Sequence, residues 1–115
     1  MTDTQTKTTP TITWDDFMAI NMVAGTITQA EINEKAKRPA YKLWVDCGPT
    51  LGIKQSSAQI TVHYNPEDLI GKKVLCVTNF EPMRIAGFKS EILVCGFYDE
   101  NGDVILASAD KDIHN

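Results

Sequence analysis

The sequence NFEPMRIAGFKSE at residues 79–91 lies between two apolar runs, at residues 74–77 and 92–94. Each run has the length of a buried strand. The stretch between them holds a proline, a glycine, two cations, an amide, a hydroxyl and large apolar side chains, which is more chemistry than a simple connector requires. We therefore expect residues 79–91 to form a long loop that joins two strands of a small β-barrel and helps to form its binding surface.

Three strands are expected before this loop, at residues 22–31, 41–47 and 52–60. Gly25 in the first strand is a candidate kink or bulge of the kind that small barrels need to turn corners. Apolar and polar residues alternate along the second strand, which predicts that one face is buried. Trp44 falls on its polar face, where it either packs under a loop, the interpretation we favour, or contributes to a binding or subunit surface.

Two short helices are also expected. One covers residues 13–20 with Thr13 as N-cap, and the other covers residues 64–71 with Asn65 as N-cap. The first helix is too apolar for a solvated turn. It either plugs one end of the barrel or docks against a partner subunit through its large side chains, which are Trp14, Phe17, Met18 and Ile20.

The remaining strands are expected at residues 73–80, 92–98 and 104–107, and the last two are joined by the hairpin signal at residues 100–103. Three strands, a short helix and two strands is the order of the OB-fold, a five-stranded Greek-key barrel. We therefore expect an all-β OB-fold with a short N-terminal helix, a short helix between strands three and four, and an additional C-terminal strand. This domain takes residues 13–108, between a disordered N-terminal tail, residues 1–12, and an acidic C-terminal tail, residues 109–115.

Composition limits the class of protein. A chain of 115 residues is one domain. It has no apolar run of the roughly 20 residues that cross a bilayer and no signal-peptide pattern, so we expect a cytoplasmic protein without membrane insertion. The net charge of −4 is unusual for an autonomous nucleic-acid binder. Residues 54–89 nevertheless hold five cations against three acids, whereas residues 91–115 hold one cation against six acids, so a modest cationic patch is expected on an acidic body.

Candidate catalytic and metal-binding groups are few. Cys47, Cys76 and Cys95 are odd in number and far apart, which argues against disulfides and zinc and favours buried apolar roles. His63 and His114 have no companion at a metal-ligand spacing, so we expect no metal and no cofactor. No pattern pairs a nucleophile with a base, and no glycine-rich phosphate loop is found. These observations favour a binding module over an enzyme.

Two ligand classes fit a surface built from the polar third strand and residues 79–91. RNA requires cations for its phosphates and exposed rings for base stacking, which Phe80 and Phe88 can supply. An extended peptide requires apolar pockets with a polar rim, and Met83, Ile85 and Phe88 can supply the apolar contacts. Both classes stay open on this evidence, and a surface that serves only assembly is a third hypothesis.

Three motifs closely resemble the CsaA family: GIKQSSAQI at residues 52–60, NFEP at 79–82 and RIAGFKSE at 84–91. That family is a branch of the tRNA-binding-domain superfamily, which includes the C-terminal domain of some methionyl-tRNA synthetases and EMAP-II-like proteins. The resemblance spans about residues 17–107. It implies an OB-fold homodimer, with the N-terminal helix in the interface, that acts as an export-related chaperone for unfolded or precursor polypeptides and cooperates with the secretion ATPase. Structure-dependent tRNA binding is the older activity of the superfamily.

Carried over to matching positions, the resemblance assigns ten residues to the ligand surface: Lys54, Gln55, Ser56, Ser57, Asn79, Phe80, Arg84, Phe88, Lys89 and Ser90. The second motif departs from its tRNA-binding relatives, which commonly read methionine-arginine-glycine where this chain reads Ile85-Ala86-Gly87. A cation is lost there and apolar bulk is gained. We therefore expect a homodimeric chaperone that binds polypeptide without ATP. The alternative is a structure-dependent tRNA-binding protein that acts on, or is recruited to, aminoacyl-tRNA synthetases.

Overall fold

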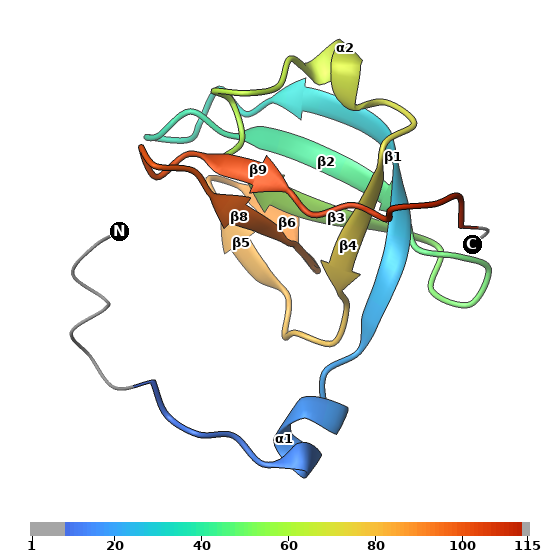
Figure 1. Cartoon of the computed structure of the whole chain (residues 1–115). Helices are drawn as coiled ribbons and strands as arrows, with labels where there is room; N and C mark the ends of the chain where they lie inside the picture. Colours follow the sequence, from blue (N-terminus) through green and yellow to red (C-terminus); the bar gives the residue numbers. More distant parts are fainter. Residues whose placement is uncertain (1–8, 114–115) are drawn as a thin grey trace.

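The chain folds around a bent antiparallel sheet. The structure is a computed structural model that describes residues 9–113 (Figure 1). Five strands form the sheet in the spatial order β3-β2-β1-β4-β7. Their bounds are Met22–Ile32 for β1, Tyr41–Asp46 for β2, Ile53–Ala58 for β3, Lys73–Val77 for β4 and Leu93–Val94 for β7.

The two edges of this sheet approach each other and nearly close it into a barrel. The carbonyl of Gln55 in β3 accepts hydrogen bonds from the backbone N–H groups of Glu91 (2.8 Å) and Ile92 (3.3 Å), just before β7. Such closure satisfies backbone groups that an open edge strand would leave unpaired. The expected all-β, OB-type barrel is therefore confirmed.

The barrel interior is filled by the alternating side chains of its strands. Ile27, Leu43, Val45, Val74 and Cys76 are all nearly or completely inaccessible. The expected alternation of residues 41–47 is thus confirmed, since Leu43 and Val45 point inward. This core holds the strands rigidly enough to present a surface elsewhere.

A short helix, α2 (Pro66–Leu69), covers one end of the barrel (Figure 1). Its Leu69 is completely buried among the core residues. Asn65 occupies the N-cap position, as predicted, although its side chain makes no capping hydrogen bond. The Asn65 amide instead donates to the Asp68 carboxylate at 3.4 Å.

Gly25 does not supply the bulge of the first strand. The register shift lies at Thr28, between Ile27 and Gln29. Gly25 instead lies where the interior is tightly packed, because a Cβ atom there would stand 2.5 Å from Val45 Cγ1. Only glycine fits at that distance without moving the core.

Residues 79–91 are not a long loop, as the sequence led us to expect, but contain a β-hairpin. Its strands are β5 (Met83–Ile85) and β6 (Phe88–Ser90). The two-residue turn between them places Ala86 at φ 49° and Gly87 at φ 80°, the left-handed pair that hairpins of this length require. The usual sequence signal for this turn is Asn-Gly. This chain has Ala86-Gly87 there, so the sequence did not predict the hairpin.

The expected strand at residues 92–98 is interrupted. It divides at Cys95 into β7 and β8 (Gly96–Tyr98), and β8 forms a separate hairpin with β9 (Val104–Leu106). The Cys95 N–H donates to the carbonyl of Leu75 (2.9 Å), and the N–H of Ala107 donates to the carbonyl of Cys95 (3.0 Å). The additional C-terminal strand is therefore confirmed as one half of this hairpin.

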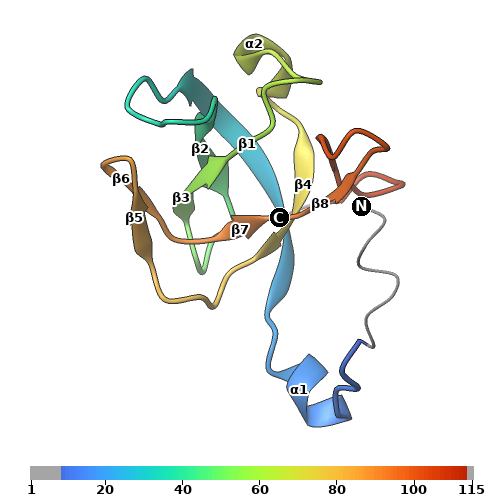
Figure 2. The same ribbon diagram turned by 90° about the vertical axis from the view of Figure 1, so that its left-hand side faces the viewer.

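The N-terminal helix α1 (Trp14–Met18) projects away from the barrel (Figures 1 and 2). Thr13 and Asp16 form a complete capping box at its start. None of its residues is buried, so the interpretation that it plugs the barrel is wrong. The predicted N-terminal tail falls mostly outside the described residues, as does His114. Within residues 9–113, no helix combines the length and the apolar character needed to cross a membrane.

Candidate functional site

The β5–β6 hairpin is held against the outer face of β2 and β3. Ser90 Oγ accepts a hydrogen bond from the Ser57 N–H at 3.1 Å. The Gln55 amide, oriented so that both of its polar atoms are bonded, accepts from Trp44 Nε1 (3.2 Å) and donates to the Lys89 carbonyl (3.0 Å). Three separate segments are thus tied together, and Figure 2 shows the hairpin standing beside β3.

Trp44 and Phe88 form the apolar part of this attachment. Their ring centroids are 5.3 Å apart with the planes inclined by 76°, a favourable edge-to-face arrangement. Lys42 Nζ lies 5.8 Å from the centre of the Phe88 ring, within cation–π range. Packing of Trp44 under another segment, the interpretation we favoured, is confirmed. The Phe88 ring therefore already contacts side chains of the same chain.

The hairpin presents two unlike faces. Met83 pairs with Ser90 and Ile85 with Phe88, so these four side chains point to the side that faces the barrel. Met83 and Ile85 lie on the outer strand and stay exposed. Arg84 pairs with Lys89 on the opposite face, where Arg84 Nη1 donates to the Gly87 carbonyl at 3.1 Å. The site therefore offers apolar contacts on one side and two cations on the other.

The structure brings together Gln55, Ser57, Phe88, Lys89 and Ser90, with Arg84 beside them. Phe80 is exposed on the bend that leads into the hairpin. The other predicted ligand residues, Lys54, Ser56 and Asn79, face elsewhere or already have partners within the chain.

Ser56 points into the barrel because it pairs with Leu43, and it is 1% exposed. Lys54 lies on the same inward-facing side of β3 and forms an ion pair with Glu91 at 3.7 Å. Asn79 is occupied at the base of α1, where its Oδ1 accepts from the Asn21 N–H (3.0 Å) and its Nδ2 donates to the Ala19 carbonyl (2.6 Å). Asn79 thus positions the connection between α1 and β1.

Sequence reasoning did not assign Lys42 or Trp44 to the site. The available signal was their place on the polar face of a strand that pairs with the polar third strand. Trp44 lies opposite Gln55 and Lys42 opposite Ser57, so residues on one outer face of this strand pair meet the hairpin together.

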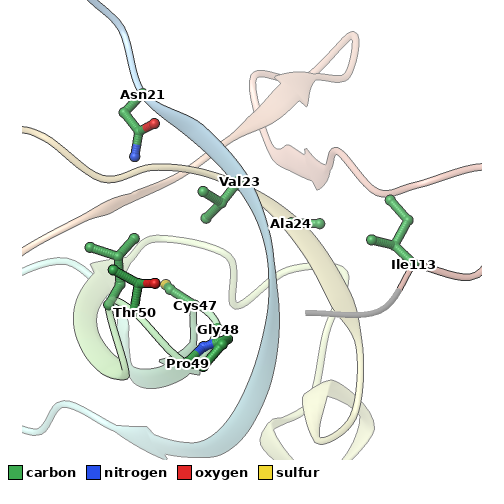
Figure 3. Close-up of a pocket in the computed structure, with 9 residues that line it drawn as sticks. Asn21, Val23, Ala24, Cys47, Gly48, Pro49, Thr50 and Ile113 are labelled. Atoms are coloured by element: carbon green, nitrogen blue, oxygen red, sulfur yellow. The ribbon is translucent and has the colours of Figure 1, made fainter.

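Two grooves lie on the surface of the described residues. The first, which we call the hairpin groove, has a volume of about 400 Å³ and is lined by residues 31–35, Lys42 and residues 86–88. The second has a volume of about 460 Å³ and is more apolar. Figure 3 shows Val23 and Ala24 of β1, the turn at residues 48–50 and Ile113 around it.

A separate set of apolar side chains is exposed on α1 and on the β8–β9 hairpin. Trp14 and Met18 are 75% and 63% exposed, and Phe17 and Ile20 are exposed as well. On β8–β9 the exposed residues are Phe97, Tyr98 and Ile105. Large apolar side chains that gather on an exposed element in this way indicate interaction sites.

The titratable groups point to structural roles. Burial raises the pKa of Cys76 to about 12, with a further contribution from the neighbouring Cys47, and burial raises the pKa of Cys47 and Cys95 as well. Raised values leave these thiols protonated and unreactive. Among residues 9–113, no three His, Cys, Asp or Glu side chains are grouped as metal ligands would be.

A hydrogen bond between side chains ties the β8–β9 hairpin to the turn that follows β3. His63 Nε2 lies 2.7 Å from Asp99 Oδ2. The hydrogen bond from His63 is the main reason that the pKa of Asp99 is lowered, and the Asp103 N–H contributes next. In addition, Tyr64 Oη accepts from the Leu106 N–H at 2.9 Å.

Comparison with known families gives a direct match. Residues 22–115 match the family described as "Putative tRNA binding domain". Curated relatives include the methionine–tRNA ligase of Methanothrix thermoacetophila, 36% identical over 93% of this chain, and methionine–tRNA ligase 1 of Bacillus anthracis, 38% identical over 90% of this chain. This chain spans only about 15% of the length of those enzymes.

Solved structures give matches over most of both chains. The chaperone CsaA of Bacillus anthracis is 48% identical with a TM-score of 0.84, and the CsaA chaperone protein of Picrophilus torridus is 42% identical with the same TM-score. Each match covers 90% of this chain and 94% of the other. A MetRS-related protein of Pyrococcus horikoshii is 27% identical with a TM-score of 0.79, covering 91% of this chain and 94% of that one. The chain therefore belongs to the tRNA-binding domain family and is a CsaA-like member of it.

Proposed function

We propose that this protein is an export-related chaperone that binds extended segments of unfolded or precursor polypeptides without ATP. The observation that carries the proposal is the β5–β6 hairpin, where exposed Met83 and Ile85 lie on one face and Arg84 and Lys89 on the other. Methionine and isoleucine at an accessible edge accept varied apolar side chains. A polar rim and backbone groups nearby suit an extended chain.

Three features favour polypeptide over nucleic acid as the ligand. The Phe88 ring already contacts Trp44 and Lys42, which limits its use as a stacking platform. Lys54 and Lys42 each have a carboxylate partner, Glu91 and Glu31, respectively. The net charge of −4 opposes the approach of a phosphate backbone.

We further propose that the protein acts as a homodimer. A second copy would cover the apolar side chains of α1, which the barrel leaves exposed. Trp14, Phe17, Met18 and Ile20 would lie in the interface, and the exposed β8–β9 residues are candidates to meet them. The proposal also includes a cytoplasmic location, action by binding without catalysis, and cooperation with the secretion ATPase, all of which rest on the CsaA-like family membership.

An aggregation assay tests the polypeptide-binding function directly. Purified protein at one dimer per client should suppress light scattering by a chemically denatured client after dilution, with and without ATP. The double variant Met83→Ser with Ile85→Ser should lose most of this effect. Ile70→Ser, which alters an exposed isoleucine beside α2, is the matched control. Lack of suppression by the parent protein would refute the proposal.

Structure-dependent tRNA binding, on or beside an aminoacyl-tRNA synthetase, is the second candidate. Its support is the family match and the pair of exposed cations Arg84 and Lys89. Filter binding of folded tRNA at two salt concentrations tests it. Replacing both cations by alanine should lower the slope of log affinity against log salt by about 2, since each phosphate contact releases counterions. Absence of tRNA binding at low salt would remove this candidate.

A further inference from the structure

The hairpin groove contains a buried amide with one unused donor. Asn33 is 5% exposed. Its Oδ1 accepts from the Lys35 N–H (3.1 Å), and its backbone N–H donates to the Ala40 carbonyl (2.9 Å). Its Nδ2, however, has no partner among the described residues. Buried donors rarely stay unpaired because they give up hydrogen bonds to water.

The orientation of the Asn33 amide is determined by its surroundings. Rotating the amide by half a turn would place Nδ2 against the Lys35 N–H, donor facing donor. The oxygen therefore faces Lys35, and the unused group is a neutral N–H donor. Its complement is a hydrogen-bond acceptor.

Charges around the groove show what kind of acceptor fits. The lining contains two lysines, Lys35 and Lys42, and two glutamates, Glu31 and Glu34. Lys42 and Glu31 are paired at 3.6 Å. A lining with balanced charge gives little attraction to a phosphate or a carboxylate, so an uncharged acceptor fits better.

The apolar neighbours of the groove favour a peptide unit over a nucleobase. Phe88 lines the groove, but Trp44 and Lys42 already contact its ring. Ile85 lies directly opposite Phe88, and Met83 follows on the same face. Exposed aliphatic side chains two residues apart match the same-side spacing of an extended polypeptide.

We propose that the hairpin groove binds an uncharged amide carbonyl of a polypeptide and that Asn33 Nδ2 donates the hydrogen bond to it. The identity of this ligand rests on the proposed polypeptide-binding function. Lys35 extends to the hairpin tip, where its Cδ lies 3.5 Å from the position of a Cβ on Gly87. Because Asn33 Nδ2 is inaccessible in the unbound chain, binding requires part of the groove lining to move, and the exposed Lys35 side chain is the group that we expect to move.

Nuclear magnetic resonance on the full chain tests the proposal. The probe is N-acetyl-leucinamide, an uncharged molecule with two amide carbonyls and one aliphatic side chain. The Asn33 side-chain NH₂ signals and the Gly87 amide should shift in a saturable manner with the probe. Adenosine and inorganic phosphate, titrated separately, should leave both unchanged.

A pair of matched variants sharpens the test. Asn33→Asp keeps the acceptor for the Lys35 N–H and removes the donor, and the probe should bind at least tenfold more weakly. Asn101→Asp makes the same charge change in the exposed β8–β9 turn and should bind the probe as the parent does. If Asn33→Asp does not fold, the titration of the parent protein decides the question alone.

Three outcomes would overturn the inference: an Asn33 shift with adenosine alone, a shift with phosphate alone, or no shift with any probe. The aggregation assay is independent of these results. If the protein suppresses aggregation but the probe does not shift the Asn33 signals, the proposed function stands and this inference is refuted. If the Asn33 signals shift in a saturable manner but aggregation is not suppressed, the inference stands and the proposed function is refuted.

Discussion

The β5–β6 hairpin and α1 both expose large apolar side chains, and they differ in what surrounds them. On the β5–β6 hairpin, Met83 and Ile85 have cations on the opposite face, and the hairpin is bonded to the barrel through Ser57 and Gln55. Within α1 the charged residues are Asp15 and Asp16, both in the first turn, and the helix stands clear of the barrel (Figure 2).

This difference separates two kinds of recognition. A surface that mixes apolar and polar groups and is bonded to the barrel suits reversible binding of polypeptides of varied sequence. A surface dominated by large apolar side chains suits lasting burial, because the cores of homodimer interfaces are depleted in charge. We therefore relate the hairpin to client binding and α1 to assembly, and the following predictions test that division.

The largest effect is expected from Trp14→Ser combined with Met18→Ser. Burying each of these side chains in a dimer is worth about 1.5–3 kcal/mol, so their loss should weaken dimerisation by about a hundredfold or more. Sedimentation equilibrium measures this change. Val62→Ser, at an exposed position between β3 and α2, should leave the dimer intact. A parent protein that sediments as a monomer would contradict the role of α1 in assembly.

The next effect concerns the hairpin. Met83→Ser with Ile85→Ser should weaken binding of a denatured client by about ten- to a hundredfold, from about 0.7–1.4 kcal/mol of lost burial at each partly exposed side chain. Sedimentation and thermal unfolding should stay unchanged. Fluorescence anisotropy of a labelled, unfolded client measures the affinity. Equal loss of client binding in the α1 double variant would show that the two surfaces are not separate.

A core substitution tests whether the barrel is only the support. Gly25→Ala places a methyl group 2.5 Å from Val45 Cγ1 and 3.1 Å from Cys76 Sγ, so it should lower the free energy of unfolding by about 1–3 kcal/mol through overpacking. Urea denaturation measures the change. Client affinity per folded molecule should not alter. A stability equal to that of the parent would mean that Val45 can move aside.

The smallest effect separates the regions by pH. Because the pKa of Asp99 is lowered in the folded state, its stabilising contribution is complete above the unfolded pKa and is lost as pH falls through the folded pKa. Acid should therefore loosen the β8–β9 hairpin before it affects β5–β6. Carbon-13 titration of the Asp99 carboxylate in the parent and in His63→Ala is the measurement. The variant should show a pKa nearer the ordinary aspartate value, and an unchanged pKa would refute the role of His63.

Local patterns were sufficient to predict most of the fold. The Thr13 N-cap, the alternation along residues 41–47 and the hairpin signal at residues 100–103 each depend on neighbours a few residues apart. The β5–β6 turn was missed because Ala86 is a rare residue at positive φ. Its conformation is held by the pairing of β5 with β6 and by the packing of Phe88 on Trp44.

The site was predicted less completely, for a related reason. Ser56 and Gln55 are adjacent in a polar motif, yet Ser56 faces the core and Gln55 faces the hairpin. Which of them turns inward depends on the register between β3 and β2, and a shift of one residue would exchange them. The polar motif alone carries no information on that register.

The sequence by itself determined the family, the order of the barrel strands and the two helices, and the residues that carry apolar or charged side chains. Only the tertiary structure decided which of those residues remain accessible. It buried Ser56, tied Asn79 to the base of α1 and covered the Phe88 ring, while it left Met83, Ile85 and Trp14 exposed. Strand periodicity is a local property of the chain, whereas exposure depends on contacts between segments up to 60 residues apart, such as that of Asn79 with Ala19.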